Sequence, residues 1–252
     1  RIEGAIKYSL SHAQIHHPNF MDDFNKKYIV ENPEIIVDYL KANENVKGYA
    51  TRSIVSGMAA TSKGSAAVLI NGIDTKLEPN CTAISESLVE GTYLNKFKKN
   101  PVLVGKFIAD KLGLKIKSKL ILSFQDAENN VVSTSFRVEG IYKSNSTMLD
   151  GISIFVKKDD LDGLAGLKGA IHEIAIVYNE IELIDQENEK LSSKVGTNLL
   201  ESWTELSPEL GFANEFMGLV AYIFMTIILF ALAFGVINTM LMAVLERETP
   251  SI

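Results

Sequence analysis

The sequence has little of what disulfide bridges, metal sites and covalent catalysis require. Its one cysteine, Cys81, cannot form an internal disulfide, so an apolar core must stabilise any folded domain. Only four histidines occur, with no cysteine or acidic cluster at ligand spacing around them. His16 and His17 are adjacent, and on a strand adjacent side chains point to opposite faces. The sequence therefore predicts no metal site.

Phosphate-binding and nucleophile motifs are also missing. Ser62-Lys63-Gly64-Ser65 has a lysine beside glycine and serine, but it lacks the upstream glycine and the strand-to-helix context of a phosphate-binding loop. No GxSxG motif occurs, and the acid pairs Asp22-Asp23 and Asp159-Asp160 favour solvated surface over acid/base catalysis. We expect a chain that is not an enzyme and carries no cofactor, with any ATP bound by another chain.

A concentrated positive face is lacking as well. Setting aside Arg247, Glu246 and Glu248 from totals of 25 basic and 31 acidic residues leaves 24 and 29. The lysines are scattered or mixed with acids, whereas binding to a phosphate backbone needs clustered basic residues. The sequence predicts no nucleic-acid partner.

What the sequence does have is a run of thirty residues without a formal charge, Phe216 to Leu245, between Glu215 and Glu246. About 20 apolar residues span a bilayer core, whereas a buried core helix needs only about 10 to 14. The position near the C-terminus excludes a cleaved signal peptide. We predict a transmembrane helix, whose orientation the lone Arg247 leaves undecided.

The chain begins at Arg1 without a methionine and stops a few residues after this run, at Ile252. We expect it to be a segment of a longer membrane protein.

Before the apolar run, the pattern opens as strand, helix, strand, strand. Ser11 to His17 alternates like a strand, and Asn32-Pro33 starts a helix with asparagine as N-cap and proline at the first position. Lys47 to Ile73 then predicts a hairpin around Ser62 to Ser65.

A second signature begins at Pro101. The run PVLVGKFIADKLGL places Val104, Phe107, Ile108 and Leu112 on one helical face, with Gly113 as C-cap. Beyond it we predict further strands and short helices, which are a hairpin around 125–130, strands at 152–156 and 173–178, a short helix or turn at 159–167 and a helical stretch at 180–194. The fold class is α+β with mostly antiparallel strand pairing.

Taken together, these segments resemble a known family. The runs 101–124 and 136–164 are similar to the extracytoplasmic domain of MacB-like and lipoprotein-releasing ABC transporter permeases. INTMLMAVLER (237–247) resembles the end of the second membrane helix of the FtsX-like permease domain, and AQIHHPNF (13–20) resembles the strand after the first membrane helix in the lipoprotein-releasing, LolC/LolE-like branch.

The sequence departs from the family pattern in two places. Lys117-Ser118 stands where the family often has Gly-Asp, which affects only the local turn. After Glu246-Arg247 the family continues with a basic, glycine-containing segment that couples to the ATPase, whereas this chain reads ETPSI.

The resemblance implies a periplasmic MacB-like core domain, with a porter and a β-rich sabre subdomain, followed by one transmembrane helix. The implied segments are a porter subdomain at 8–74 and 170–207, a sabre subdomain at 75–169, a linker at 208–215, the membrane helix at 216–245 and the start of a cytoplasmic segment at 246–252.

The implied function is that of a permease subunit in the bacterial inner membrane, with Phe216 at the periplasmic end of the helix and Arg247 at the cytoplasmic end. Its implied partners are a cytoplasmic ABC ATPase, a second permease subunit, membrane lipid, and a lipoprotein substrate or a periplasmic carrier or adaptor. ATP-driven motion would reach the periplasmic domain, most naturally to release lipoproteins from the inner membrane. A helix that is nearly free of ionisable groups agrees with a role other than lining a substrate path.

Extraction of a lipoprotein needs an apolar surface for its acyl chains, since each buried methylene contributes about 0.8 kcal/mol. We expect that surface at the segment Glu209 to Tyr222. The candidate contacts are Met217, Leu219, Val220 and Phe224, and the alternative is that these are ordinary lipid-facing residues. Asn238 and Thr239 are candidate helix-packing residues.

Two kinds of alternative remain. Within the family they are MacB-like efflux of drugs or peptides and regulation of cell-wall hydrolases. From a different class, a singly anchored extracytoplasmic binding or scaffold protein without an ATPase would share the membrane helix.

Overall fold

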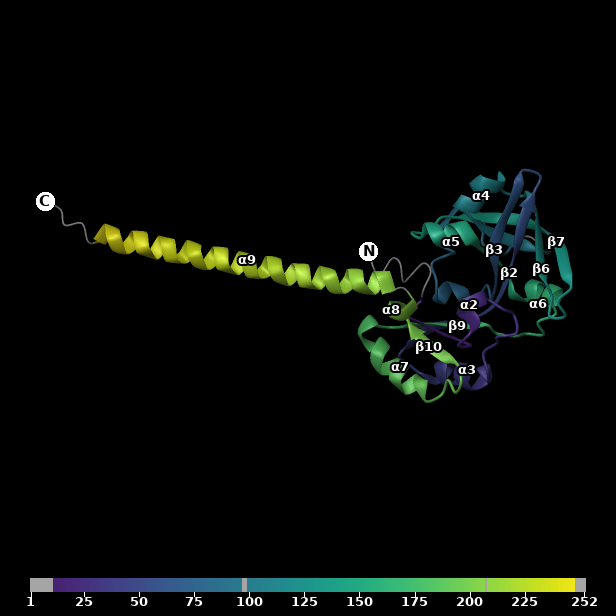
Figure 1. Cartoon of the computed structure of the whole chain (residues 1–252), viewed down its shortest axis with the longest axis horizontal. Coiled ribbons are helices and arrows are strands. Elements are labelled where there is room, and N and C mark those ends of the chain that lie inside the picture. The colour runs from purple at the N-terminus through teal and green to yellow at the C-terminus, as the bar shows by residue number, and fades with distance from the viewer. Residues whose placement is uncertain (1–10, 97–98, 207, 248–252) are drawn as a thin grey trace. The chain divides into compact units, whose positions relative to one another are not determined.

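The computed structural model describes residues 11–96, 99–206 and 208–247, which belong to two compact units that divide between Leu206 and Ser207. The first unit is a mixed domain of strands and short helices, and the second is one helix (Figure 1).

In chain order, the strands are β1 (Ala13–His16), β2 (Val46–Thr61), β3 (Gly64–Ile73), β4 (Leu88–Gly91), β5 (Pro101–Gly105), β6 (Lys119–Gln125), β7 (Val131–Tyr142), β8 (Ser153–Lys157), β9 (Glu173–Tyr178) and β10 (Leu199–Ser202). The helices are α2 (Phe20–Asp23), α3 (Pro33–Ala42), α4 (Lys106–Leu112), α5 (Thr147–Ile152), α6 (Lys158–Ala165), α7 (Ile184–Ser192), α8 (Trp203–Leu206) and α9 (Pro208–Arg247), with the 3-10 turns η2 (Glu78–Asn80) and η3 (Ile181–Leu183).

Six strands of the domain close into a ring in the order β2-β3-β8-β5-β7-β6. Closure follows because β6 pairs with β7 on one side and with β2 on the other. The β3–β8 and β5–β7 pairs are parallel, and the other pairs in the ring are antiparallel. The interior is filled by apolar side chains, among them Val55, Ile70, Leu122 and Phe136, each at most 3% exposed. The ring occupies the upper part of the domain in Figure 1.

The strands β5 and β8 are buried on both faces. Val102 and Val104 point into the ring, while Leu103 joins a second apolar cluster that also contains Tyr142 and Phe155. This division follows from the alternation of side chains along a strand. It explains why PVLVG is uniformly apolar rather than alternating.

Outside the ring, β10, β1 and β9 extend the sheet from the first half of β2. α3 and α7 bury Ile36, Leu40, Ile184 and Leu191, and they lie in the lower part of the domain in Figure 1. β2 therefore serves both parts, because Val46–Arg52 pair with β9 and Gly57–Ala60 pair with β6.

Gly57 stands where β6 joins β2. A Cβ at this position would lie 2.8 Å from the carbonyl oxygen of Ser123 and 3.0 Å from Cδ1 of Ile70. Only glycine allows the two strands to approach this closely, so Gly57 permits the ring to close.

The predicted opening, hairpins and strands are confirmed, and two local predictions are corrected. α3 begins at Pro33 as expected, but Asn32 adopts φ 49° and makes no side-chain cap. The predicted helix at 101–112 begins only at Lys106, because Val-rich PVLVG favours a strand. Val104 therefore lies in β5 and Phe107 is 59% exposed, while Gly113 caps α4 as predicted, at φ 61°.

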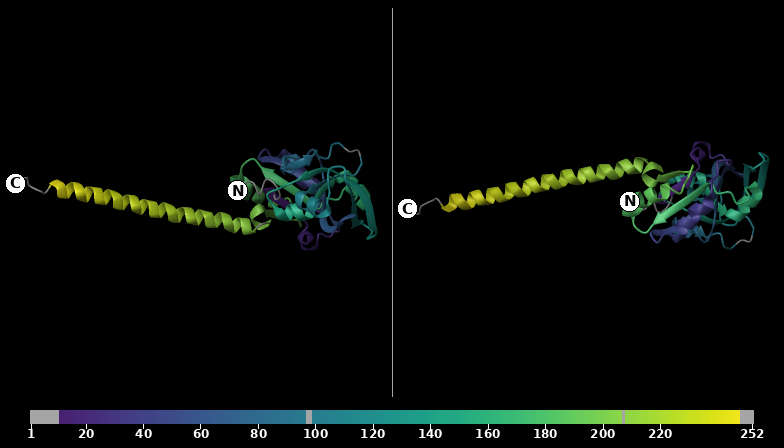
Figure 2. Two further views of the ribbon diagram at one scale, coloured as in Figure 1. Left: turned by 90° about the horizontal axis from the view of Figure 1, so that it is seen from above. Right: turned by 90° about the horizontal axis from the view of Figure 1, so that it is seen from below.

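The second unit, α9, runs without interruption from Pro208 to Arg247 (Figure 2). The residues predicted as a linker, 208–215, are helical and form its first two turns. The porter and sabre boundaries at 74/75 and 169/170 stay a prediction. With these boundaries β2 lies wholly in the porter segment, although it pairs with β6 of the sabre segment as well as with β9 of the porter segment.

Candidate functional site

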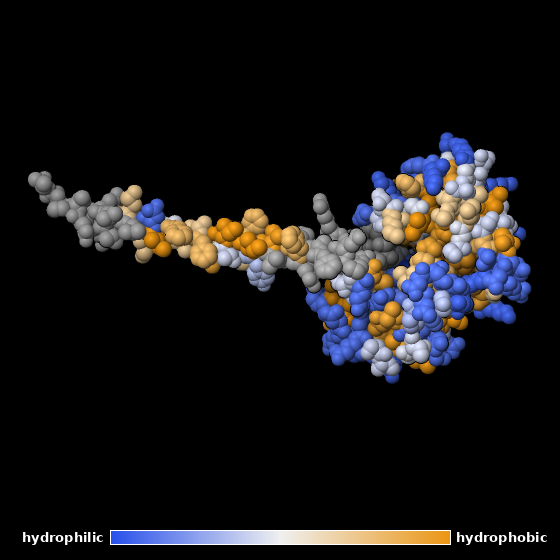
Figure 3. Space-filling view, viewed as in Figure 1, coloured by the Kyte–Doolittle hydropathy of each residue, from blue (hydrophilic) through white to orange (hydrophobic). Residues whose placement is uncertain are grey.

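The candidate functional element is the apolar part of α9. Val220–Met240 form a span of 21 residues with a mean hydropathy of 2.6, none of it buried within the structure. At about 1.5 Å of rise per residue this span is about 30 Å long, the thickness of a bilayer core. Figure 3 shows apolar residues along this helix, whereas polar residues cover much of the visible face of the domain.

Two of the predicted contact residues can be placed on this helix. Val220 is half-buried and Phe224 is 61% exposed. Met217 and Leu219 belong to α9, but their side chains lie outside the described residues, as do those of 209–215. Their contact with a substrate therefore stays a prediction.

The two threonine hydroxyl groups of α9 form hydrogen bonds within the helix itself. Thr226 Oγ1 donates to the carbonyl oxygen of Tyr222 and Thr239 Oγ1 to that of Gly235, each at 2.8 Å. Asn238 is exposed on the helix surface. Its amide is therefore the better candidate of the predicted pair for a hydrogen bond to a neighbouring helix.

A shallow groove of about 670 Å³ runs along α9 beside Thr239. Ala231, Gly235 and Thr239 line it at intervals of four residues, with larger apolar residues on its flanks. Such spacing of small residues is typical of helices that pack closely in membranes. Sequence reasoning singled out the polar pair and missed this pattern, although the spacing was readable in the sequence.

Within the domain, three buried charged residues form a network around Arg52. Its guanidinium contacts Glu78 on η2, with Nη2 2.7 Å from Oε1, and also contacts Glu173 on β9. All three residues are at most 6% exposed. Burial alone would lower the pKa of Arg52, but the charges of Glu78 and Glu173 raise it. The network fastens η2 and β9 to β2.

A serine and a lysine also meet beside β2. Ser53 Oγ donates to Asp162 at 2.6 Å and contacts Lys158 Nζ, while Lys158 forms an ion pair with Asp162 at 2.7 Å. A catalytic Ser–Lys pair needs an unpaired lysine and an accessible hydroxyl. Ser53 is fully buried, so this cluster fastens α6 to β2 instead.

His12 and Cys81 line a cavity of about 630 Å³. Burial, and then the charge of Glu78, raise the pKa of the Cys81 thiol to about 12, which leaves it unreactive at neutral pH. Burial and the nearby Lys47 lower the pKa of His12, and its Nδ1 accepts the backbone N–H of Tyr178 at 3.0 Å. This cavity therefore holds a neutral thiol and a neutral imidazole.

The adjacent histidines take different partners. His16 Nε2 lies 2.7 Å from Glu201 on β10, whereas the ring of His17 stacks on Tyr28. Among the described residues, no group of three or more His, Cys, Asp or Glu side chains is placed to hold a metal ion.

Two solved transporter domains share this fold. The periplasmic region of MacB from Actinobacillus actinomycetemcomitans matches 83% of this chain and 97% of its own length, with a TM-score of 0.55 and 12% identity. The extracellular domain of the noncanonic ABC-type transporter YknZ from Gram-positive bacteria matches 76% of this chain and all of its own, with a TM-score of 0.51 and 14% identity. No protein-family model and no curated protein matches the sequence.

The chain thus combines the fold of these extracytoplasmic transporter domains with an apolar helix long enough to cross a membrane. The predicted class, an α+β MacB-like domain followed by one such helix, is confirmed. At these identities the likeness establishes the fold and leaves the substrate open.

Proposed function

We propose that this chain is part of a permease subunit of an ABC transporter, located in the bacterial inner membrane with the domain on the periplasmic side. The observation that carries the proposal is the MacB-like fold directly followed by the apolar span Val220–Met240. In this role the chain binds no nucleotide itself. A cytoplasmic ATPase hydrolyses ATP, and a second permease subunit completes the assembly.

The properties of α9 suit the transmission of motion. It is one helix over 40 residues, about 60 Å at 1.5 Å per residue, with its only proline at Pro208. A continuous helix resists bending, because sharp kinks need an internal proline, a π-bulge or an inserted group. In this mechanism a displacement at Arg247 moves the first turns of the helix as well, because no hinge between them absorbs the motion.

The substrate class that we propose is lipoprotein, released from the inner membrane toward the outer membrane. Val220 and Phe224 offer apolar surface near the start of the span, which acyl chains would occupy. Burial of each methylene contributes about 0.8 kcal/mol, so a few contacts suffice to hold an acyl chain transiently. Met217 and Leu219 complete the proposed surface.

A second candidate function is MacB-type transport with a periplasmic adaptor. It is favoured by the structural likeness to the MacB periplasmic region, which covers nearly the whole of that domain. The two candidates share the ATPase and the membrane topology, and they differ in what contacts the helix.

Photocrosslinking in the full-length protein separates the candidates. A photoreactive residue at Val220 or Phe224 is expected to label a lipidated protein when ATP is supplied, whereas one at Met242, beyond the span, is expected not to. Labelling of an unlipidated adaptor supports the second candidate, and labelling of phospholipid alone contradicts both.

The transporter class has its own test. The full-length sequence is expected to contain three further membrane segments, and the purified protein is expected to carry a stoichiometric ATPase. A full-length protein with α9 as its only hydrophobic segment would be a singly anchored binding or scaffold protein.

A further inference from the structure

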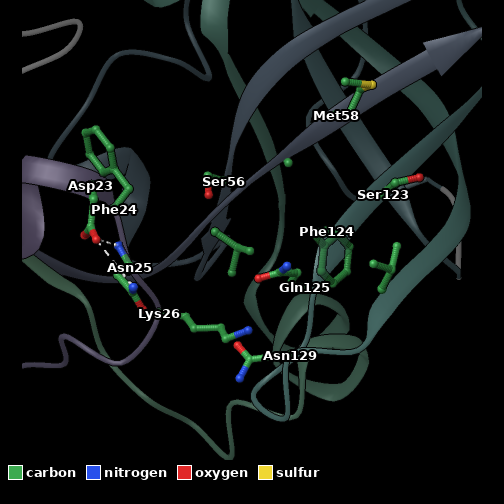
Figure 4. A pocket seen from close by; sticks show the side chains of 13 residues that line it. Asp23, Phe24, Asn25, Lys26, Ser56, Met58, Ser123, Phe124, Gln125 and Asn129 are labelled. Atoms are coloured by element: carbon green, nitrogen blue, oxygen red, sulfur yellow. Dashed lines mark hydrogen bonds between the residues drawn. The ribbon is translucent and has the colours of Figure 1, made fainter.

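A groove of about 400 Å³ lies at the fork where β2 leaves β9 and joins β6. One wall is the segment after α2, from Asp23 to Lys26, and the other is formed by Ser56 to Met58 on β2 together with the end of β6. Asn129, in the turn between β6 and β7, closes one end. Figure 4 shows the side chain of Lys26 directed toward Asn129.

The ammonium group of Lys26 is the unusual feature of this groove. Its Nζ is buried and has no hydrogen-bond partner among the residues that the structure describes. Removing an ammonium from water without giving it a partner is unfavourable. Such a group is stabilised when an anion enters beside it.

The neighbouring acids are committed to other contacts. Asp23 accepts the backbone N–H of Asn25 at 3.0 Å, and Asp126 accepts the N–H groups of Glu128 and Asn130 at 2.9 and 2.8 Å. Burial raises the pKa of the Asp126 carboxyl, but hydrogen bonds from Asn130 and Glu128 outweigh this effect and lower the pKa. The nearby charge of Lys26 lowers it further. Neither carboxylate is bonded to the ammonium.

The groove is held in shape before any ligand arrives. His172 Nε2 donates to the carbonyl oxygen of Lys26 at 3.0 Å, and its Nδ1 accepts the N–H of Ile54 at 3.1 Å. Phe24, which lines the groove, adopts φ 50°, a left-handed conformation that is uncommon for an aromatic residue. The backbone of this wall is therefore fixed, which lowers the entropic cost of binding, while the buried Nζ of Lys26 has to become accessible as the ligand enters.

The lining also defines the chemistry of the ligand. Ser56, Gln125 and Asn129 are exposed in the walls and can donate hydrogen bonds. Met58 and Val131, 50% and 73% exposed, give the groove an apolar rim. The lining also includes the Asp23 carboxylate, which accepts the backbone N–H of Asn25. With that acid engaged, one cation, several neutral donors and an apolar rim suit a carboxylate carried on a polypeptide, rather than a multiply charged phosphate, which usually meets several basic groups.

We propose that this groove is a binding site for a carboxylate of a polypeptide partner, bound at Lys26 and presented either by an acidic side chain or by a chain terminus. This site does not depend on the permease assignment. It gives the domain a point of specific contact outside the membrane.

The experiment uses the full chain in detergent micelles with ¹³Cε-labelled lysine. The probes are Ac-Gly-Glu-Gly-NH₂, Ac-Gly-Gly-Gly-OH, the neutral Ac-Gly-Gln-Gly-NH₂ and inorganic phosphate. Lys26 and Lys27 are followed in one spectrum, each assigned by its change to methionine. Lys27 is exposed and lies over the ring of Tyr28, so it is the matched control.

We expect at least one acidic peptide to shift the Lys26 signal saturably while the Lys27 signal stays unchanged. We also expect Lys26→Met to weaken binding of that peptide at least tenfold, and Lys27→Met to weaken it less than twofold. The responding peptide tells a side-chain carboxylate from a terminal one. No response to either peptide, an equal response to the neutral peptide, or tighter binding of phosphate overturns the proposal.

Stability provides a second readout. If Lys26 is kept for binding, Lys26→Met removes an unpaired buried charge and raises the urea midpoint of the free chain, whereas Lys27→Met leaves it unchanged. A lower midpoint for Lys26→Met would show that the lysine serves the fold, and it would overturn the proposal.

Discussion

Single side chains in this domain fasten segments that are far apart in the sequence. Arg52 joins β2 to η2 and β9, Lys158 joins α6 to Ser53, and His172 joins β2 to the segment after α2. These contacts all involve β2 between Arg52 and Ile54, where it passes from β9 to β6. These polar side chains serve the fold at this crossing.

The Arg52 network gives a first prediction. Arg52→Met leaves two buried carboxylates without their cation, so we expect a loss of about 3–5 kcal/mol in the free energy of unfolding. Urea denaturation followed by the fluorescence of Trp203, the only tryptophan, measures it. Lys41→Met is the control: its ion pair with Asp38 is largely exposed, at 58% and 77%, and we expect a change below about 0.5 kcal/mol. Equal effects of the two changes would contradict a special role for Arg52.

His172 gives a prediction about pH. Burial lowers its pKa, and the neutral ring uses both nitrogens in hydrogen bonds. Below a pH of about 6.5 His172 is protonated in the unfolded chain but stays neutral in the folded chain. The free energy of unfolding therefore falls as the pH falls. Between pH 6.5 and 5 one histidine contributes at most about 2 kcal/mol to this loss.

The measurement compares urea midpoints at pH 7.5 and pH 5 for the wild-type chain and for His172→Gln. We expect a smaller decrease in the urea midpoint of the variant, because it lacks the imidazole of His172. The carboxylates titrate equally in both chains and contribute the same decrease to each. A parallel decrease in the two chains would show that His172 is not responsible.

At the scale of elements, the alternation of apolar and polar residues and the positions of turn residues were sufficient to predict most strands and helices of the domain. The hairpins around 62–65 and 125–130 follow from period-two patterns that flank polar turns, and Gly113 ends α4 as its position suggested. The run 101–112 was misassigned because a short apolar segment has no periodicity that distinguishes strand from helix.

Closure of the ring, and the groove at Lys26, were beyond such reasoning. Pairing of β6 with β2 joins residues more than 60 positions apart, and no local pattern specifies it. The environment of Lys26 also depends on residues that are distant in the sequence, since it is formed by β2, β6 and the turn at Asn129. The sequence shows a lysine in a polar loop, and only the fold shows that its ammonium is enclosed.

Gly57 tests the closure of the ring. Gly57→Ala would place a Cβ against the backbone of Ser123, so we expect a loss of about 1–3 kcal/mol. Gly163→Ala in α6 is the control, because nothing lies within 4 Å of its added Cβ, and we expect a gain of up to about 1 kcal/mol from helix propensity. Urea midpoints measure both changes, and an unchanged midpoint for Gly57→Ala would contradict a tight β2–β6 contact.

At the scale of the whole molecule, a domain with a buried apolar core is joined in the chain to a helix whose apolar residues are exposed on all sides. Between 222 and 240, every large apolar residue whose exposure is given is more than half exposed, which in water would favour aggregation. A bilayer removes this cost. The apolar residues of the domain are therefore buried mainly in its own core, whereas those of α9 need a bilayer to cover them.

Membrane insertion of α9 is open to a direct test. Leu229→Arg places a charge near the centre of the span, which costs about 2.5–3.5 kcal/mol on insertion scales. We expect a larger fraction of this variant to be released from membranes by alkaline extraction. Phe216→Arg, before the span, is expected to behave like the wild-type chain, and equal release of the two variants would argue against a membrane span at 220–240.

One consequence of the shared strand concerns changes in chain length. β2 presents side chains to the outer sheet over its first half and to the ring over its second, and its pairing with β3 runs without a register shift from Arg52 to Thr61. An insertion or deletion of one residue anywhere between Thr51 and Ser56 would invert the inward and outward positions of everything that follows. Related sequences should therefore tolerate a longer or shorter loop at Ser62-Lys63, while the length of the strand itself stays fixed.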